Sequence, residues 1–282
     1  MKVTQAEINS FTEVLYAKYG FDFTCYEPQS LNRRINRVLH VLGYNTIHDL
    51  WTDMLQKPSM VYKFMDEVSV ELTAMFRDPV MWSRLRSVLY NEFKAKQNLK
   101  IWIAGCSTGE EVYTLAIVLY EMGMLEQVQI LATDMNNKAL EVARSGIYHE
   151  LKIIEYEKNY REYNKFGTFG RYFKKNSPHV LMRSDLLKNT LFKYHNLVTD
   201  KSDSDFDLIL CRNVMIYFDA ETKSKMVKNF HRHINDGGYL ITGFFDSIFC
   251  EENQGLFNNE LSGFRMFKKS PFMRVNRSNL SA

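Results

Sequence analysis

From residue 99 onward the chain alternates short β-rich runs with helical runs, and this alternation constrains the fold more than any other feature. LKIWIAG and QVQILATD read as strands, and EEVYTLAIVLYEMG and NKALEVARSG read as the helices that follow them. FDLILCRN and GGYLITGFF are further strands, with a helical run over 220–235 and an Asp-Gly-Gly turn between them. A last strand is expected near residues 264–268. Strands that alternate with helices form a mostly parallel sheet covered on both faces, so we expect a doubly wound α/β domain.

The first 75 residues follow helical spacing instead. Leu31, Ile35, Val38, Leu39 and Leu42 lie on one face of a predicted helix, Arg33, Arg37 and His40 lie on the other, and Arg34 falls at the boundary. Further helices are expected over 45–55, with Thr46 near the cap, and over 60–70. These patterns predict a helical domain (1–75), a linker helix (76–97) and an α/β domain (98–282).

Charge and cysteine content exclude several classes of protein. The formal net charge is +3, which is too even for broad binding to nucleic acid or to a membrane surface. Cys25, Cys106, Cys211 and Cys250 lie far apart and form no metal-binding pattern, so free buried thiols and no metal are expected. The N-terminus does not resemble a signal peptide, and no run of 18 apolar residues occurs, so we expect a cytoplasmic protein.

The run IWIAGCSTGEE carries the strongest local signal for a ligand site. A strand leads into a loop with Gly105 and Gly109 and then into a helix, which is where nucleotide-like ligands meet a doubly wound sheet. The G-x-x-x-G spacing fits neither the dinucleotide nor the phosphate-loop motif. Glu110 and Glu111 suit an ammonium group, and the alternative is a tight turn whose acids favour the helix N-terminus.

Three further segments place polar residues where ligands bind. Asp134 ends the second strand, where it suits two ribose hydroxyls or caps the next helix. Arg212 and Asn213 end the third strand, and Arg212 has a structural ion pair as its alternative. Thr73 and Arg77 share a face if their segment is helical, with a solvated face as the default.

Together these segments resemble the CheR-type chemotaxis receptor methyltransferases. The matching strings are ELTAMFRDP, AGCSTGEEVYTLAI, ATDMNNKALEVARSGIY, FKYHNL, FDLILCRNVMIYFD and GGYLITG, in the family's order over residues 20–270. The resemblance implies a small helical N-terminal domain and a Rossmann-like domain that uses S-adenosylmethionine and releases S-adenosylhomocysteine. It also implies methyl transfer to glutamate side chains on the cytoplasmic helices of chemoreceptors.

The resemblance assigns cofactor contacts residue by residue. Glu111 matches an acid of the first loop, with Glu110 as the other register, and Asp134 matches the ribose-binding acid. Asn196 and Leu197 match a pair beside the adenine, and Asn213 and Val214 match a pair beside the methionine moiety. Thr73 and Arg77 match positions near the methionine, and Gly105 allows close backbone approach. Glu71 stands where the family commonly has Asn, which puts that contact in doubt.

The resemblance also suggests catalytic and partner-facing residues. A glutamate carboxylate is already ionised at neutral pH and needs no general base. Arg77 is therefore expected to orient either the acceptor or the cofactor carboxylate, with Tyr217 near the methyl group. Arg34 and Arg37 resemble a receptor-facing basic helix face, against the alternative of an ordinary solvated face. Residues 150–184 occupy the place of a small antiparallel subdomain that docks a receptor tail peptide in some members, and their composition leaves peptide docking open.

Two other functions remain open at this stage. One is methylation of nucleic acid, for which the chain lacks an N-P-P-Y-like string and a basic footprint. The other is a cofactor-binding or nucleotide-binding interaction module without transfer activity, supported only by Glu71. We expect a monomer that binds no nucleic acid and does not insert into a membrane. Labelled cofactor, offered to receptor fragments and to nucleic acid, would separate the three readings.

Overall fold

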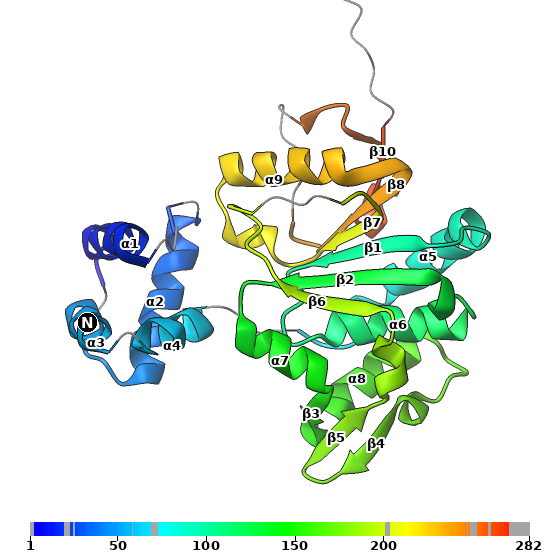
Figure 1. Cartoon of the computed structure of the whole chain (residues 1–282), viewed down its shortest axis with the longest axis horizontal. Coiled ribbons are helices and arrows are strands. Elements are labelled where there is room, and N and C mark those ends of the chain that lie inside the picture. The colour runs from blue at the N-terminus through cyan, green and yellow to red at the C-terminus, as the bar shows by residue number, and fades with distance from the viewer. Residues whose placement is uncertain are drawn as a thin grey trace, which may run out of the picture.

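The fold consists of a helical N-terminal body and a larger body built around a sheet (Figure 1). The structure is a computed structural model. It describes residues 3–19, 23–24, 26–57, 59–68, 73–200, 204–246, 248, 253–258 and 261–270.

The N-terminal domain contains α1 (Gln5–Tyr19), α2 (Pro28–Leu42), α3 (Ile47–Gln56) and α4 (Ser59–Val68). Thr46 caps α3 in a capping box, which confirms the predicted cap. Helix α2 begins with Pro28, which is compatible with a first helical turn, and ends at Gly43 in the left-handed conformation. The apolar faces of the four helices form a hydrophobic core of their own, separate from the core around the sheet.

The large sheet has seven strands in the order β6-β2-β1-β7-β8-β10-β9. The first five run parallel, β10 pairs antiparallel with β8, and β9 pairs antiparallel with β10, which confirms the predicted doubly wound, mostly parallel fold. Their bounds are β1 (Leu99–Ala104), β2 (Val128–Asp134), β6 (Thr190–Tyr194), β7 (Phe206–Cys211), β8 (Ile234–Thr242), β9 (Phe257–Asn258) and β10 (Met266–Lys269).

Helices cover both faces of this sheet (Figure 1). Ile101 and Ile103 of β1 point into the core shared with α5 (Pro79–Val88), α6 (Glu110–Glu121) and α8 (Glu150–Tyr163). Trp102 and Ala104 point to the opposite face, which α9 (Ala220–His233) covers. A strand buried on both faces explains why β1 reads as a nearly continuous apolar run.

A small antiparallel sheet is inserted between α7 (Asn137–Ser145) and β6. Its strands are β3 (Ile147–His149), β5 (His179–Met182) and β4 (Phe173–Asn176), in that order, as the resemblance implies. Helix α8 belongs to this insertion and was not recognised in the tyrosine-rich sequence. The hydroxyls of Tyr160 and Tyr172 donate to Glu121 of α6 at 2.6 and 2.8 Å, which fixes the insertion to the main domain.

Three local expectations differ from the structure. Strand β8 begins before the Asp-Gly-Gly turn, which forms an irregularity within it, and ends at Thr242 rather than continuing through Phe244 and Phe245. The segment with Thr73 and Arg77 is a turn, because Phe76 and Asp78 adopt positive φ angles of 54° and 58°. Strand β6 was not predicted, because an edge strand with mostly exposed side chains lacks a clear apolar pattern.

The described residues contain neither a membrane-spanning helix nor a metal site. No helix there is long and apolar enough to cross a membrane. No group of His, Cys, Asp or Glu side chains there has the arrangement of a metal site. Cys106 and Cys211 are free, buried thiols, and Cys25 and Cys250 lie outside the described residues.

Candidate functional site

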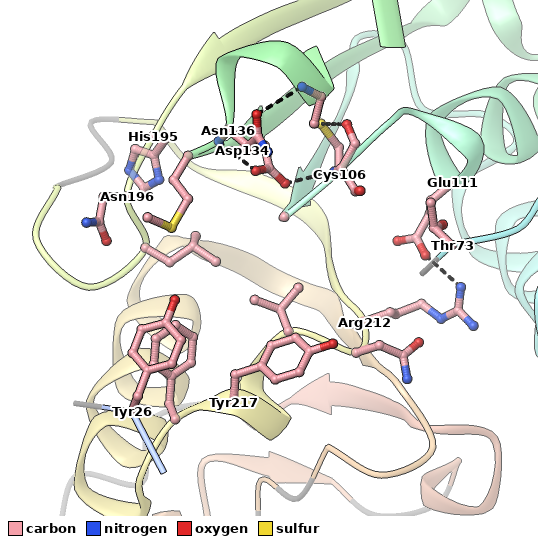
Figure 2. Close-up of a pocket in the computed structure, with 18 of the residues that line it drawn as sticks. Tyr26, Thr73, Cys106, Glu111, Asp134, Asn136, His195, Asn196, Arg212 and Tyr217 are labelled. Atoms are coloured by element: carbon pink, nitrogen blue, oxygen red, sulfur yellow. Dashed lines mark hydrogen bonds and ion pairs between the residues drawn. The ribbon is translucent and has the colours of Figure 1, made fainter. Parts of the chain in front are cut away.

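A cleft lies at the carboxyl ends of the parallel strands (Figure 2), on the side of the sheet where Figure 1 places the N-terminal domain. It has about 1030 Å³ of empty space, part of it open to solvent. Its walls come from the segments that follow β1, β2, β6 and β7, from the turn before α5, and from the N-terminal domain. Ligands of doubly wound sheets bind at this edge.

Asp134 organises the loop after β1. Its carboxylate accepts hydrogen bonds from the backbone N–H of Ser107 at 2.8 Å and of Asn136 at 2.9 Å (Figure 2). Asn136, not Asp134, caps α7 by accepting from the N–H of Ala139. Burial raises the pKa of Asp134, and the backbone hydrogen bonds oppose that shift. The side chain therefore lines the cleft without serving as the helix cap.

Gly105 lies where the loop touches the opposite wall. Its φ of 84° is in the left-handed region, and a Cβ there would come within 2.5 Å of Val214. Both residues line the cleft. A side chain at position 105 would therefore fill space at the centre of the site.

The two adjacent acids at the start of α6 face different surroundings. Glu111 lines the cleft, where burial raises its pKa while the charges of Arg212 and Arg77 oppose the shift. Glu110 is fully buried on the other side, where it accepts from Tyr156 at 2.8 Å and pairs with Lys152 at 2.9 Å. Glu111 is thus available to a ligand, whereas Glu110 holds the insertion in place.

Arg212 joins three segments of the cleft. Its guanidinium pairs with Glu111 at 2.6 Å (Figure 2). It also pairs with Asp78 at 2.7 Å and donates to the carbonyl of Arg77 at 3.1 Å. The side chain is 2% exposed. The sequence leaves open whether Arg212 forms a structural ion pair or faces the ligand crevice. The structure shows both, because Arg212 forms these ion pairs and also lines the cleft.

Thr73 and Arg77 line the cleft from the turn before α5. The N–H of Phe76 donates to the Thr114 hydroxyl at 2.9 Å, and the indole of Trp82 donates to the carbonyl of Arg77 at 2.9 Å. These two hydrogen bonds hold the segment with Thr73 and Arg77 in a turn instead of a helix. Glu71 lies outside the described residues.

Asn213 and Val214 line the cleft from the loop after β7. Asn213 has a φ of 59°, an uncommon conformation for a side chain other than glycine. The buried carboxylate of Asp246 holds this loop by accepting from the N–H groups of Asn213 at 2.5 Å and Ile216 at 2.9 Å. Sequence reasoning did not name Asp246, although it closely follows the end of β8 and Asp134 likewise stands at the end of β2.

The N-terminal domain supplies an aromatic and cationic wall. Arg34 of α2 lies 3.7 Å from the ring centroid of Tyr217 and 5.7 Å from that of Tyr26, and donates to the carbonyl of Val68 at 2.8 Å. It is 7% exposed, and burial lowers its pKa. No described carboxylate pairs with it, and its Nη2 has no hydrogen-bond partner within the described residues.

The expectation of an exposed basic face is wrong for Arg34, because the aromatic rings bury it. Arg37 is exposed, does not line the cleft, and contacts Glu67 through the backbone carbonyl at 2.8 Å and the carboxylate at 3.6 Å. The two arginines therefore lie in different environments although they share a helix.

The segment after β6 closes the remaining side of the cleft. Asn196 and Leu197 line it, and the Asn196 side chain accepts from the N–H of Val198 at 3.0 Å. Sequence reasoning did not name several other lining residues: Tyr26, Met135, Asn136, His195 and Phe218. Most of them are adjacent in sequence to a predicted site residue, namely Asp134, Asn196 or Tyr217. This adjacency was the signal that could have identified them.

Comparisons with known proteins agree with this geometry. The family model described as "CheR methyltransferase, SAM binding domain" matches residues 71–262, and "CheR methyltransferase, all-alpha domain" matches residues 6–69. A protein named "Putative methyltransferase Cher3" from Pseudomonas putida is 35% identical over 95% of this chain and 98% of its own length. Proteins named chemotaxis protein methyltransferase are 29% identical in Borreliella burgdorferi and 28% in Pseudomonas aeruginosa. These alignments cover 90% and 96% of this chain, and 92% and 97% of the relatives.

Proposed function

This chain belongs to the CheR methyltransferase family, and we propose that it methylates glutamate side chains on the cytoplasmic helices of chemoreceptors. The observation that carries the choice of acceptor is Arg34, a buried guanidinium at the cleft without a described acidic partner. A buried charge is costly unless it is paired, so this position favours an anionic acceptor. The names of the chemotaxis relatives support the same substrate class.

The residues of the cleft suit S-adenosylmethionine. Glu111 offers a carboxylate for the cofactor's ammonium group, and Asp134 has acceptor capacity for ribose hydroxyls beyond its two backbone hydrogen bonds. The missing Cβ of Gly105 leaves the space between the loop and Val214 open. Asn196 and Leu197 are proposed for the adenine end, and Thr73, Asn213 and Val214 for the methionine end. When bound, the cofactor supplies an electrophilic methyl group on a positively charged sulfur.

The proposed reaction is a direct displacement. The cofactor, held by Glu111, Asp134 and Asn196, would supply a methyl group bonded to a positively charged sulfur, and an acceptor carboxylate oxygen would be the nucleophile that takes it. A negative and a positive charge are both removed, and no proton moves. The protein therefore has to align two groups and exclude water, and such positioning is worth about 7–11 kcal/mol.

Three side chains have proposed roles in this alignment. Arg34 binds the acceptor carboxylate, and the ring of Tyr217 holds the Arg34 guanidinium in place while excluding water from the same side. Arg77 is proposed to bind the cofactor carboxylate, because its charge acts on Glu111, the proposed ammonium partner. Arg37 contributes to an exposed surface that attracts an acidic helix.

The test offers methyl-labelled cofactor to the protein with a chemoreceptor cytoplasmic fragment, with DNA and RNA, or alone. We expect label on the receptor fragment that mild alkali releases, as a carboxyl methyl ester does. A fragment whose methyl-accepting glutamates are replaced by alanine is the matched control and should remain unlabelled. Label on nucleic acid, or cofactor binding without transfer to the receptor, would contradict the proposal.

A further inference from the structure

Two phenylalanines just beyond the end of β8 have no part in the proposed reaction. Phe244 is 59% exposed and Phe245 is 76% exposed, and their rings meet edge to face with centroids 5.3 Å apart. We refer to these two residues as the rim pair. Single exposed apolar side chains are common on proteins, whereas exposed aromatic residues in mutual contact are typical of interaction sites.

The rim pair is held beside the cleft by a rigid connection. A Cβ at Gly243, the residue before Phe244, would lie 2.6 Å from the backbone nitrogen of Asn213, which lines the cleft. Asp246, the residue after Phe245, accepts from the N–H groups of Gly243, Asn213 and Ile216. The rim pair and the loop of Asn213 are therefore fixed to the same buried carboxylate.

A positive charge accompanies the rim pair. The guanidinium of Arg265 lies 5.0 Å from the ring centroid of Phe244. The backbone of Arg265 is itself tied to the end of β8, because its carbonyl accepts from the N–H of Thr242 at 2.9 Å. The surface next to the cleft thus combines exposed aromatic rings with a cation, which is complementary to a helix that has an apolar face and acidic residues.

We propose that the rim pair is a docking surface for the acceptor helix that carries the methylated glutamate, an inference that rests on the proposed function. An acceptor glutamate enters a cleft lined by Asn213 and Tyr217 of the loop after β7 and by Arg34 of α2. The next turn of a rigid helix lies about 5.4 Å along its axis and has to rest on whatever borders the cleft. On the Asn213 side, that border is the rim pair. The apolar residues of the acceptor helix contact the two rings, and its acidic residues face Arg265.

The first experiment measures methyl transfer by the Phe244→Ser/Phe245→Ser variant of the full chain. With the receptor fragment, its KM should rise about tenfold or more, as expected when aromatic anchors of an interface are lost. Its Kd for S-adenosylhomocysteine, measured by calorimetry, should stay within about twofold of the wild-type value, because neither phenylalanine lines the cleft. Phe166→Ser is the matched control, because Phe166 is 100% exposed on the insertion, and its KM should not change.

A second experiment does not depend on activity. A photoreactive benzophenone side chain at position 245 should cross-link to the receptor fragment, and the same group at position 166 should not. An unchanged KM in the double variant, or no cross-link from position 245, would overturn the docking role while wild-type methylation still supports the proposed function. Weaker S-adenosylhomocysteine binding in the double variant would also overturn it, by assigning the rim pair to cofactor binding. Failure of the wild-type enzyme to methylate the fragment would instead contradict the proposed function.

Discussion

The charged side chains on the two walls of the cleft have different kinds of partners. On the sheet side, Asp134 accepts two backbone hydrogen bonds, and Glu111 is paired with Arg212. On the N-terminal side, the buried Arg34 has aromatic rings and one backbone carbonyl as its described neighbours. The difference lies in the carboxylate partners: Arg212 on the sheet side is paired with Glu111 and Asp78, whereas no described carboxylate pairs with Arg34. Within the described residues, one guanidinium nitrogen on each wall, Arg34 Nη2 and Arg212 Nε, lacks a hydrogen-bond partner.

This difference suggests how the two ligands share one cleft. A cofactor site gains from acids already oriented by the protein, because preorganised groups need no rearrangement on binding. An acceptor site for a carboxylate gains from a desolvated cation, because hydrogen bonds to charged groups are the stronger ones. We therefore expect substitutions on the sheet-side wall and on the N-terminal wall to have separable effects on the free energy of unfolding, on cofactor affinity and on the rate of methyl transfer.

Arg212→Met should give the largest effect, and mainly on stability. The substitution leaves Glu111 buried beside Asp78 without their shared cation, and breaking a buried pair costs about 3–5 kcal/mol. Denaturant unfolding checks this value. Arg161→Met removes an exposed ion pair on α8 and should lower the unfolding free energy by no more than about 0.5 kcal/mol. Equal losses for both variants would show that Arg212 does not organise the sheet-side wall.

Asp134→Asn should weaken cofactor binding about 100-fold, since hydrogen bonds to a charged group contribute about 1.5–3 kcal/mol each. Calorimetry with S-adenosylhomocysteine measures the change. Asp185→Asn, which alters an exposed acid paired with Arg183, is the control and should bind normally. If Asp134→Asn retains wild-type affinity, the sheet-side wall is not the ribose site.

Arg34→Met should lower kcat/KM for the receptor fragment about 30-fold, or about 2 kcal/mol, with little change in cofactor affinity. Methionine fills similar space, and removing a buried charge that no described carboxylate pairs with should leave the unfolding free energy equal or higher. Arg37→Met, on the exposed face of the same helix, should reduce the rate only a few-fold. Parallel losses of stability and transfer in Arg34→Met would identify a purely structural arginine.

The smallest expected effect is the pH dependence of cofactor affinity and of the free energy of unfolding. Burial raises the pKa of Asp134 and of Glu111, so both accept protons at a higher pH than the ordinary range near 4. As pH falls through this window, cofactor affinity should decrease, because the ribose site requires the Asp134 carboxylate. Stability should move the opposite way, because a raised pKa in the folded state favours folding at low pH and loses that contribution as pH rises. Asp134→Asn should remove the Asp134 contribution to both profiles and leave that of Glu111, and an unchanged affinity profile in that variant would exclude Asp134 as a titrating group.

The parallel strands made part of the site predictable. Residues that follow β1, β2 and β7 converge because these strands end at one edge of the sheet, and this placed Gly105, Asp134 and Asn213 together. The same reasoning applied to β8 would have indicated Asp246. Adjacent residues on a helix point about 100° apart, so the sequence could not tell whether Glu110 or Glu111 faces the cleft.

Other features depend on contacts between distant segments. Arg34 falls at the boundary of the apolar face of α2, and its burial comes from Tyr217 in the other domain. The turn with Thr73 and Arg77 is set by Thr114 and Trp82 rather than by local helix propensity. The tyrosines of α8 are core residues only because Glu110 and Glu121 of α6 accept their hydroxyls. None of these partners can be identified from local pattern alone.

The central claim is that one wall binds the cofactor and the other binds the acceptor carboxylate. The most direct test compares wild type and Arg34→Met in two assays: alkali-labile methyl transfer to the receptor fragment, and S-adenosylhomocysteine binding. The account predicts that transfer falls about 30-fold, or about 2 kcal/mol, while the Kd for S-adenosylhomocysteine stays within about twofold. Unchanged transfer, or a loss of cofactor affinity as large as the loss of transfer, would contradict it.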